Sequence, residues 1–429
     1  MRDIWDVIII GGGLAGYIAS NYLAREGLSV LILEKGNSVG GRAVTTKNNG
    51  HFFNLGPHAL YKKGKAKAIL EDLGIQLNGR TPKLGGILTE GHMEYAAPFS
   101  PIGTITTRYI NWNEKLEWGS VLLKLMRVDT QQVAGTTFLE WVTQTARFKK
   151  VQSLLLMLGR LATYCHAPER VSAAVILGHL KNVLGGVLYL DRGWQTIVDQ
   201  LHNQAVIRGV LIQTRKTVKQ IAPNQEDYSK VTLSDGEEIL CRNVICTAGP
   251  SELAGMLGRG EGDVLSSMIP VRGATLDVSL THLPRPKQLF AMDLTNPIYY
   301  SVHSAYAKLS EDRNSTVLHV FKYHHPDEQI DGARVKNELE QFLDKIQPCW
   351  RDQVITSRYL PQITVNKRLP QVGDEYKLRS SNIGIRGLYI AGDWACPDFI
   401  LADGAAASAK RAAEEIIRER TRCSHANQQ

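Results

Sequence analysis

The most constraining feature of this sequence is a glycine-rich loop that lies between two short apolar runs. Residues 5–10 are almost entirely apolar and rich in β-branched side chains, which is typical of a buried parallel strand. Residues 14–26 carry apolar side chains at helical spacing, and a second apolar run over residues 29–33 ends at Glu34. A strand, a glycine loop, a helix, a strand and an acidic residue, in this order, are the context that a dinucleotide-binding unit requires.

Each glycine of the loop has its own physical role in such a unit. Gly11 permits the tight turn, Gly13 lets the backbone approach a pyrophosphate, and Gly16 allows the helix to pack closely on the strand. The pyrophosphate would lie at the positive end of the helix, and the acidic residue would accept hydrogen bonds from ribose hydroxyls. The alternative is a glycine-rich turn that binds nothing. The cofactor contacts predicted in this unit are Gly11, Gly13, Leu14, Ala15, Gly16 and Glu34.

Composition and charge narrow the class of protein. The chain has 429 residues, 43% of them hydrophobic and 21% charged, which predicts a globular protein of about two to three domains. The net charge of +8 comes from Lys and Arg scattered along the chain, so no nucleic-acid partner is expected. A diphosphate ligand, an acidic substrate or an anionic membrane face is compatible with this excess, although a solvated basic surface is the simpler explanation. The six cysteines form no metal-ligand spacing and no signal peptide is recognised, so we expect a cytoplasmic protein with reduced thiols and no metal.

The segment after Glu34 distinguishes FAD from NAD. Lys35 and the turn Gly40-Gly41-Arg42 follow this residue, and the arrangement resembles the phytoene desaturase, protoporphyrinogen oxidase and flavin amine oxidase superfamily. The resemblance implies that the turn contacts the FAD diphosphate, with Lys35, Gly41 and Arg42 among the cofactor contacts. A guanidinium fixed near a diphosphate also offers paired hydrogen-bond donors.

The segment from Phe53 to His58 resembles the Asp-x-Gly-Pro-His segment of the desaturase branch, which runs beside the flavin ring. Asn54 stands where the family often has Asp, so the charge is absent here. The resemblance implies that Gly56, Pro57 and His58 contact the cofactor. His58 is either a catalytic candidate or a loop histidine without chemistry.

A third match lies in the middle of the chain, where residues 189–194 precede a predicted helix over residues 194–208. Strands are predicted over residues 209–212, 217–221, 231–234, 237–240 and 244–250. In the superfamily this order comprises a Gly-Gly helix start, a strand that contacts adenine and a strand that ends near Ala-Gly-Pro. Arg192 replaces the first glycine of that helix start. The resemblance implies that Val218 contacts the adenine moiety.

The fourth match lies near the C-terminus. Residues 387–393 predict a strand and a turn that ends in Gly392-Asp393, and a final helix is predicted from Asp403-Gly404-Ala405 to about residue 418. The resemblance implies that the Gly-Asp pair contacts the ribityl and diphosphate groups of FAD. It also implies that the N–H groups at the start of the helix face the flavin, where negative charge develops on reduction.

Together the four matches predict an α/β fold. A Rossmann-like FAD-binding domain of the glutathione-reductase type would carry a discontinuous α+β substrate domain built from two insertions. The predicted boundaries are 1–58, 189–250 and 382–420 for the FAD-binding domain, 59–188 and 251–381 for the substrate domain, and 421–429 for a flexible tail.

The insertions contain few specific signals. Residues 114–188 are predicted to be mostly helical, and their two most apolar stretches, 151–158 and 171–178, are too short to span a bilayer. We expect core or pocket helices there, with contact at a membrane surface as the alternative. Strands are predicted over residues 273–280, 298–303, 316–322 and 353–358. Residues 296–304 either form an ordinary strand, which is the favoured interpretation, or line a pocket beneath the flavin.

The expected function is oxidation of a small molecule by non-covalent FAD, with hydride transfer to flavin N5 and an unknown electron acceptor. Ile400 and Leu401 predict an apolar wall where amine oxidases usually place an aromatic residue. The first hypothesis is therefore a dehydrogenase or desaturase of a largely apolar or amphiphilic substrate. The alternatives are an amine or amino-acid oxidase and a non-catalytic binding protein of the same fold. His58 and Trp394 are the candidate catalytic residues.

Overall fold

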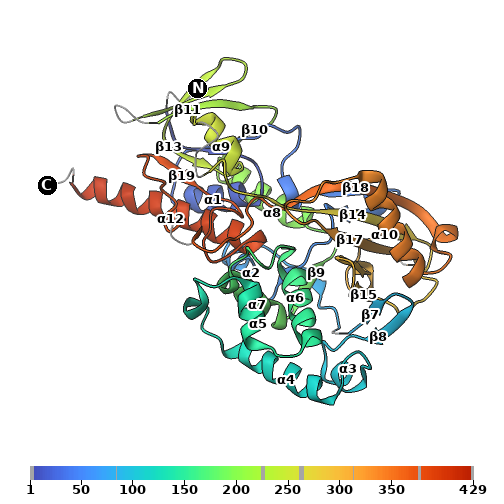
Figure 1. Cartoon of the computed structure of the whole chain (residues 1–429). Coiled ribbons are helices and arrows are strands. Elements are labelled where there is room, and N and C mark those ends of the chain that lie inside the picture. Colours follow the sequence, from blue (N-terminus) through green and yellow to red (C-terminus); the bar gives the residue numbers. More distant parts are fainter. Residues whose placement is uncertain are drawn as a thin grey trace.

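The chain folds into two large sheets and a layer of helices. The computed structural model describes residues 4–83, 85–223, 228–259, 265–312, 314–374 and 378–426. The sheet that contains β1 (Trp5–Ile10) lies at the top of Figure 1, and the sheet that contains β14 (Val271–Leu280) lies at the right. The helices from α4 (Trp112–Arg127) to α7 (Ala173–Leu184) lie at the bottom.

The first sheet is the Rossmann unit that the glycine loop predicts. Its parallel strands, in spatial order, are β10 (Leu211–Gln213), β2 (Val30–Leu33), β1, β13 (Glu238–Cys246) and β19 (Leu388–Ile390). The antiparallel strands β12 (Ser229–Leu233) and β11 (Val218–Ala222) extend it from the first half of β13. Segments from the beginning, middle and end of the chain therefore meet in one sheet, as the discontinuous pattern of motifs predicts.

Alternate side chains of the central strands enter two separate hydrophobic cores. Val7 and Ile9 pack in the core beneath the helices α1 (Leu14–Arg25), α8 (Gln195–Ile207) and α12 (Leu401–Ala426). Ile8 and Ile10 point to the opposite face and pack with residues of the β11–β12 hairpin. Since both faces are covered, residues 7–10 of the strand are all apolar rather than alternating with polar residues.

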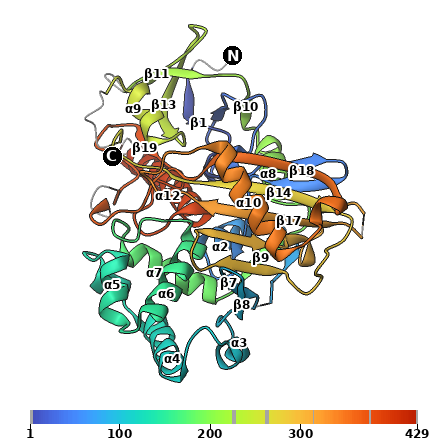
Figure 2. The ribbon, with the colours of Figure 1, turned by 45° about the vertical axis from the view of Figure 1, so that its right-hand side comes forward.

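The second sheet combines strands from both insertions. Its order is β18 (Val354–Asn366), β14, β17 (Thr316–Tyr323), β16 (Ile298–Ser301), β15 (Phe290–Asp293), β7 (Ile87–Glu90) and β8 (Met93–Ala96). The two parts join where β15 pairs in parallel with β7. Helix α10 (Gly332–Ile346) covers one face of this sheet, as Figure 2 shows.

Two helices of the helical layer begin with a capping box. Asn111 caps α4 and Thr137 caps α5 (Phe138–Thr145), each in a reciprocal capping box with the glutamate three residues later. Helix α6 (Lys149–Thr163) and α7 then pack against each other and bury the two apolar stretches of the sequence. Among the described residues, no helix is both long and apolar enough to cross a bilayer.

A small sheet connects this layer to the Rossmann unit. It consists of β5 (Leu60–Tyr61), β9 (Val187–Leu190) and β6 (Gly79–Arg80), with β9 in the middle.

Three element boundaries differ from the sequence predictions. The strands predicted over 237–240 and 244–250 are one continuous strand, β13, because its first half pairs with β12 and its second half with β19. Strand β18 runs to Asn366, well beyond the predicted 353–358, because it follows β14 along its whole length. Helix α12 continues to Ala426, so the predicted tail from residue 421 is helical up to that residue.

Candidate functional site

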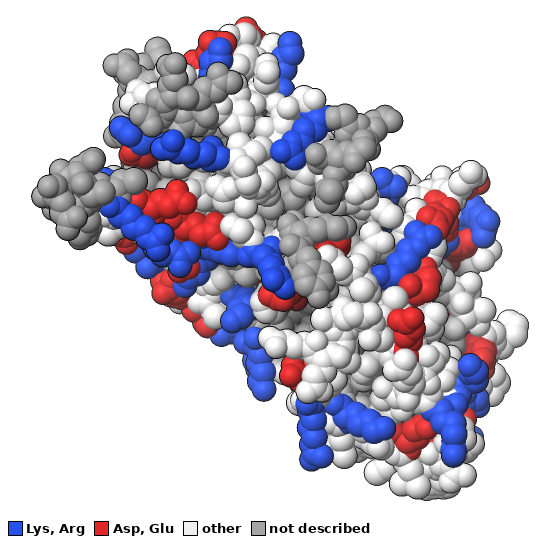
Figure 3. Space-filling view, turned by 60° about the vertical axis from the view of Figure 1, so that its left-hand side comes forward, with Lys and Arg blue, Asp and Glu red and all other residues white. Residues whose placement is uncertain are grey.

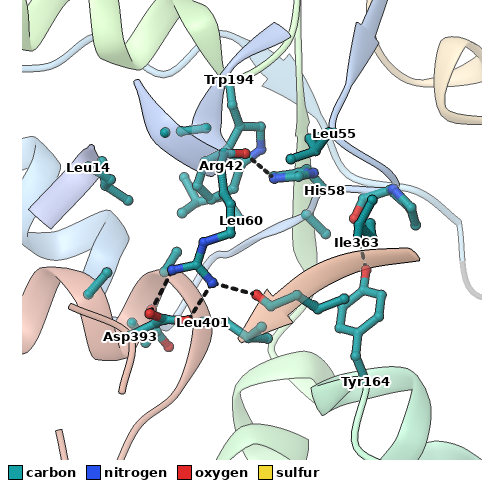
Figure 4. A pocket seen from close by; sticks show the side chains of 18 of the residues that line it. Leu14, Arg42, Leu55, His58, Leu60, Tyr164, Trp194, Ile363, Asp393 and Leu401 are labelled. Carbon is teal, nitrogen blue, oxygen red and sulfur yellow. Dashed lines mark hydrogen bonds and ion pairs between the residues drawn. The ribbon is translucent and has the colours of Figure 1, made fainter. Parts of the chain in front are cut away.

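A cavity of about 1130 Å³ extends from the Rossmann sheet to the second sheet. It begins at the carboxyl ends of β1 and β2, where ligands bind in open α/β sheets. Most of the predicted cofactor contacts line it, although they come from four distant parts of the sequence (Figure 4). The lining residues among them are Gly11, Gly13, Leu14, Ala15, Glu34, Lys35, Gly41, Arg42, Pro57, His58, Val218, Gly392, Asp393, Asp403 and Ala405.

The three loop glycines serve different purposes in the structure. Gly11 has a φ of +108°, which L side chains rarely adopt. A Cβ at Gly16 would overlap the carbonyl oxygen of Gly11, so this glycine is needed for the helix to approach the strand. A Cβ at Gly13 would meet no atom of the described residues within 4 Å, apart from its neighbours in the chain. The space over Gly13 is therefore free for a ligand to contact the backbone.

Glu34 connects the end of β2 to the glycine loop. Its Oε2 accepts a hydrogen bond of 2.7 Å from the N–H of Gly12, and its Oε1 accepts one of 2.7 Å from the N–H of Gly36. The carboxylate also lines the cavity. It is therefore held in place by the backbone at the point where the Rossmann motif predicts a ribose.

Arg42 and Asp393 form the main charged pair of the cavity (Figure 4). Arg42 Nη1 lies 2.6 Å from Asp393 Oδ2, and Nη2 lies 2.7 Å from Oδ1. The backbone N–H of Lys367 also donates to Asp393, at 2.9 Å. Burial alone would raise the pKa of the carboxyl, but the arginine charge and these hydrogen bonds outweigh it and hold the pKa of Asp393 below its ordinary value.

His58 is held between two backbone segments of the cavity wall. Its Nδ1 lies 3.0 Å from the carbonyl oxygen of Gly56, and its Nε2 lies 3.1 Å from that of Arg42. The ring also packs edge-on against Trp194, with centroids 5.3 Å apart. Burial lowers the pKa of His58, which favours the neutral ring with a single N–H. Both nitrogens face acceptors, so the geometry suits a residue that fixes the wall.

The asparagine that replaces the family's aspartate has a clear structural role. Asn54 is buried, and its Oδ1 accepts hydrogen bonds from Thr45 Oγ1 at 2.6 Å and from the N–H of Trp194 at 3.0 Å. It therefore ties this segment to the start of α8. Arg192, which replaces a family glycine, adopts a φ of +60°, a conformation that glycine would adopt more easily.

The start of α12 forms another part of the wall. Asp403 Oδ1 accepts a hydrogen bond of 2.9 Å from the N–H of Ala66, at the beginning of α2 (Lys65–Asp72). Burial raises the pKa of Asp403 to about 6. A Cβ at Gly404 would lie 2.7 Å from the carbonyl oxygen of Phe399, so this glycine allows the turn before α12 to pack closely.

Three predicted contacts, Gly16, Gly56 and Gly404, lie behind the wall rather than on it. Gly56 has a φ of +79°, and a Cβ there would lie 2.8 Å from Ile363 Cδ1. Each of these glycines is required by close packing of the segments that do line the cavity.

The structure does not place Trp394 at the cavity. Its side chain is fully buried in the core that Ile8 and Ile10 form with the β11–β12 hairpin, on the face of the Rossmann sheet away from α1, α8 and α12. Its Nε1 donates a hydrogen bond of 2.8 Å to the carbonyl oxygen of Ala248. Ile400 is also fully buried in a core cluster, whereas Leu401 does line the cavity. The geometry therefore gives no support to Trp394 as a catalytic candidate, because its ring is buried in this core directly after Asp393.

Two groups of cavity residues go beyond the favoured sequence interpretation. Tyr299, Ser301 and His303 line the cavity, so the favoured interpretation of an ordinary strand misses their position. Their spacing of two was the available signal. Tyr164 has a φ of +63° at the end of α6 and donates a hydrogen bond of 2.9 Å to the carbonyl oxygen of Pro57. No sequence pattern indicates this residue.

The geometry fits an extended dinucleotide. The space over Gly13, the immobilised carboxylate of Glu34 and the strand residue Val218 follow one another at the Rossmann end of the cavity. The cavity then continues past His58 toward the second sheet. Fold and site together define a two-part dinucleotide-binding protein, in which the nucleotide lies on the Rossmann sheet and a substrate space adjoins it.

A family model described as flavin containing amine oxidoreductase matches residues 14–417. The chain belongs to this family of flavin-containing oxidoreductases.

Individual relatives are more distant. The 4,4'-diaponeurosporene oxygenase of Staphylococcus haemolyticus is 25% identical over 276 residues, which cover 54% of this chain and 53% of that protein. Protein FixC of Escherichia coli is 58% identical over 44 residues, 10% of each chain. The matched part of the chain thus covers between a tenth and about half of the length of these curated relatives.

Solved structures resemble the chain over nearly its full length. An oxidoreductase from Methanosarcina mazei superimposes with a TM-score of 0.75 at 15% identity, covering 96% of this chain and 99% of that one. Cyclohexylamine oxidase from Brevibacterium oxydans gives a TM-score of 0.71 at 15% identity, covering 97% and 99%. At these identities the likeness confirms the fold class.

Proposed function

We propose that this chain is an FAD-dependent dehydrogenase of a small molecule with a largely apolar or amphiphilic body. The observation that carries the proposal is the character of the cavity beyond His58. Its walls there are mainly aliphatic and aromatic, although Ser301, His303 and Gln362 also line the cavity. The aliphatic and aromatic residues include Leu55, Phe99, Leu161, Tyr164, Leu289, Phe290, Tyr299, Phe321, Leu360, Ile363 and Leu401.

The carboxylates of the cavity support this proposal over one with a cationic substrate. Among the described residues that line the cavity, four are acidic: Glu34, Glu252, Asp393 and Asp403. Glu34 and Asp403 accept hydrogen bonds from backbone N–H groups, Asp393 is paired with Arg42, and Glu252 with Lys367. An ammonium substrate would find no uncommitted negative charge among them.

The FAD would extend from Val218 at its adenine end, across the glycine loop and Arg42, to the wall formed by His58 and Leu401. Bound FAD supplies a two-electron acceptor for a hydride from the substrate. The protein residues would orient the substrate and exclude water from it. We expect non-covalent binding, because Cys396 is buried and does not line the cavity.

An amine oxidase is the second candidate. The observation that favours it is the group of aromatic rings at the far end of the cavity. The ring of Tyr164 packs edge-on against that of Phe321, with centroids 5.2 Å apart, and the centroid of the Tyr299 ring lies 5.8 Å from that of Phe321. Aromatic faces attract cations even without a carboxylate.

The proposal includes contact with a membrane surface, which would supply an apolar substrate. Helix α4 exposes Trp112, Leu116, Leu123 and Met126 on one side, with exposed fractions of 68%, 72%, 59% and 54%. The short helix α3 (Pro101–Thr106) adds Ile102 and Ile105 and lies near α4 at the bottom of Figures 1 and 2. Such a patch supports docking on a bilayer.

The charge near this patch fits an anionic lipid surface. Lys124 and Arg127 of α4 are exposed beside the apolar side chains. Elsewhere, on the face that Figure 3 shows, blue groups lie beside red ones. Cations beside an apolar helix face add electrostatic attraction to anionic lipids.

The proposal is tested by measuring, in the absence of oxygen, which candidate substrates reduce the bound flavin. Polyisoprenoid hydrocarbons and alcohols of graded length, dispersed in detergent, would be compared with primary amines of graded length. We expect the polyisoprenoids to bleach the visible flavin absorption. Bleaching by amines alone, with hydrogen peroxide release in air, would replace the proposal by the amine oxidase.

A further inference from the structure

A row of polar side chains crosses the second sheet next to the cavity. Arg358 on β18 lies opposite Asp277 on β14, which lies opposite His319 on β17, which lies opposite Ser301 on β16. Asp277 and His319 are fully buried. Burying such groups costs free energy unless they are paired, so their presence in the sheet calls for an explanation.

Asp277 is the centre of the hydrogen bonds in this row. His319 Nδ1 lies 2.7 Å from Asp277 Oδ1, and Arg358 Nε donates to Asp277 Oδ2 at 3.0 Å. Thr275 Oγ1 also donates to Asp277 Oδ1, at 2.6 Å. Burial would raise the pKa of Asp277, but the charges and hydrogen bonds of His319 and Arg358 keep it lower than its ordinary value. Asp277 is therefore ionised and fixes the proton of His319 on Nδ1.

His303 continues this row to the cavity. It lies in the short helix η3 (His303–Ala305) directly after β16 and lines the cavity. Its ring meets that of His319 edge to face, with centroids 4.6 Å apart, and stacks on Tyr189 at 3.9 Å with an interplanar angle of 17°. The ring is thus held on two sides by other rings.

His303 differs from His58 in the state of its nitrogens. Both nitrogens of His58 face carbonyl oxygens. Among the described residues, none forms a hydrogen bond with a side-chain nitrogen of His303. Burial, and then the nearby His319 and His58, lower the pKa of His303 well below its ordinary value. The ring is therefore neutral and a nitrogen lone pair is open to accept a proton, while the lowered pKa makes His303 a weaker base than a free imidazole.

We propose that His303 is the proton acceptor of the oxidation, and that His319, held by Asp277, positions its ring. This inference rests on the proposed oxidase or dehydrogenase activity. One C–H bond of the substrate breaks and its hydride passes to FAD. The neighbouring X–H bond, where X is carbon or nitrogen, breaks as its proton moves to His303, and its electron pair forms the new double bond of the product. Asp277 and His319 are positioning residues.

The first test needs no substrate. Diethyl pyrocarbonate acylates neutral, accessible imidazoles, and peptide mass spectrometry locates the product. His303 is reachable through the cavity, although only 3% of it is exposed, whereas His319 is fully buried and its Nδ1 is bonded. We therefore expect slow labelling of the FAD-loaded full chain at His303 and none at His319. Absence of label at His303, while the exposed His92 is labelled, would overturn the inference.

The second test uses whichever probe, polyisoprenoid or amine, bleaches the wild-type flavin. His303→Gln should lower the flavin reduction rate by at least about 100-fold with little change in half-saturation, as loss of a general base does. Added imidazole should restore part of the rate of His303→Ala, and His92→Gln should match the wild type. If His303→Gln keeps its FAD spectrum and reacts within about threefold of the wild type, the assignment is wrong, whatever the substrate class.

The positioning role of His319 has a separate readout. His319→Gln should lower the reduction rate by about tenfold and shift its pH dependence, because the ring beside His303 changes. Among the described residues, the titratable groups that face His303 are His319, His58 and Tyr189. An unchanged pH profile in His319→Gln would contradict the positioning role.

Discussion

Arg42 and Asp393 lie 351 positions apart in the sequence, yet their side chains form a two-pronged ion pair at 2.6 and 2.7 Å. The pair connects the turn after β2 to the turn after β19 on the wall of the cavity. Asp393 is nearly fully buried, while about a third of the Arg42 side chain is exposed, at 4% and 34%. The pair therefore couples assembly of the Rossmann sheet to the shape of the cofactor site.

Replacing Arg42 should destabilise the protein. Arg42→Ala leaves the Asp393 carboxylate buried, and among the described residues the Lys367 N–H is then its remaining hydrogen-bond donor. We expect a loss of about 2–4 kcal/mol in the free energy of unfolding of the FAD-free protein, measured by urea titration. Arg42→Lys should recover part of this loss, because the charge is kept and the paired geometry is lost. Equal stability of Arg42→Ala and the wild type would contradict the role assigned to the pair.

The loop glycines offer a matched pair of substitutions. Gly13→Ala adds a methyl group within 4 Å of no described residue except its chain neighbours, at a φ of −86°, so the FAD-free protein should keep its stability. Its affinity for FAD should fall by at least about tenfold, because the methyl group occupies the space over the backbone. Gly16→Ala should instead destabilise the fold itself, since its Cβ would overlap the carbonyl oxygen of Gly11.

Thermal unfolding and FAD fluorescence titration distinguish these two effects. A Gly13→Ala variant that binds FAD as tightly as the wild type would show that the cofactor does not approach this backbone.

Asp403 should make stability depend on pH. Its pKa is raised from 3.8 to about 6 in the folded state, mainly by burial. A carboxyl with a raised folded-state pKa favours folding when protonated, so its contribution is greatest below the unfolded pKa. The contribution declines as the pH rises from about 4 to 6 and is constant above that.

The matched variant is Asp403→Asn, whose amide oxygen can still accept the Ala66 hydrogen bond. Relative to the wild type, it should gain about 1–3 kcal/mol between pH 4 and pH 7. Urea unfolding of the FAD-free proteins at both pH values measures this difference. If the difference in the free energy of unfolding between the two proteins is the same at pH 4 and pH 7, Asp403 does not titrate in this range.

The exposed side of α4 gives a prediction about lipid binding. The double variant Leu116→Ser, Leu123→Ser should bind anionic lipid vesicles at least about tenfold more weakly than the wild type in cosedimentation, since two apolar side chains no longer enter the interface. Ile207→Ser is the control, because Ile207 is 84% exposed but lies on α8. If the wild type does not sediment with such vesicles, membrane contact is not part of the function.

Sequence reasoning was strongest where the signal is local. The order of strand, glycine loop, helix and Glu34 lies within about one βαβ unit, so each part constrains the next. Contacts between distant segments were harder. The resemblance brought Arg42 and Asp393 to one cofactor, but only the folded geometry shows that they bind each other. The domain boundaries stay a prediction.

Positions that depend on side-chain direction or strand register could not be obtained from the sequence. Trp394 follows Asp393 directly, yet its ring enters the opposite core. Asp277, His319 and Arg358 are far apart in the chain and meet only because β14 pairs with β17 and β18 in one particular register.

The most direct test of the account is the visible absorption spectrum of the purified full chain, reconstituted with FAD and recorded before and after heat denaturation. We predict the bands of an oxidised flavin before heating, and the same chromophore in the supernatant once the protein has precipitated. A chain that stays colourless after incubation with FAD would contradict the assignment of this cavity to the cofactor, and with it the proposed oxidation.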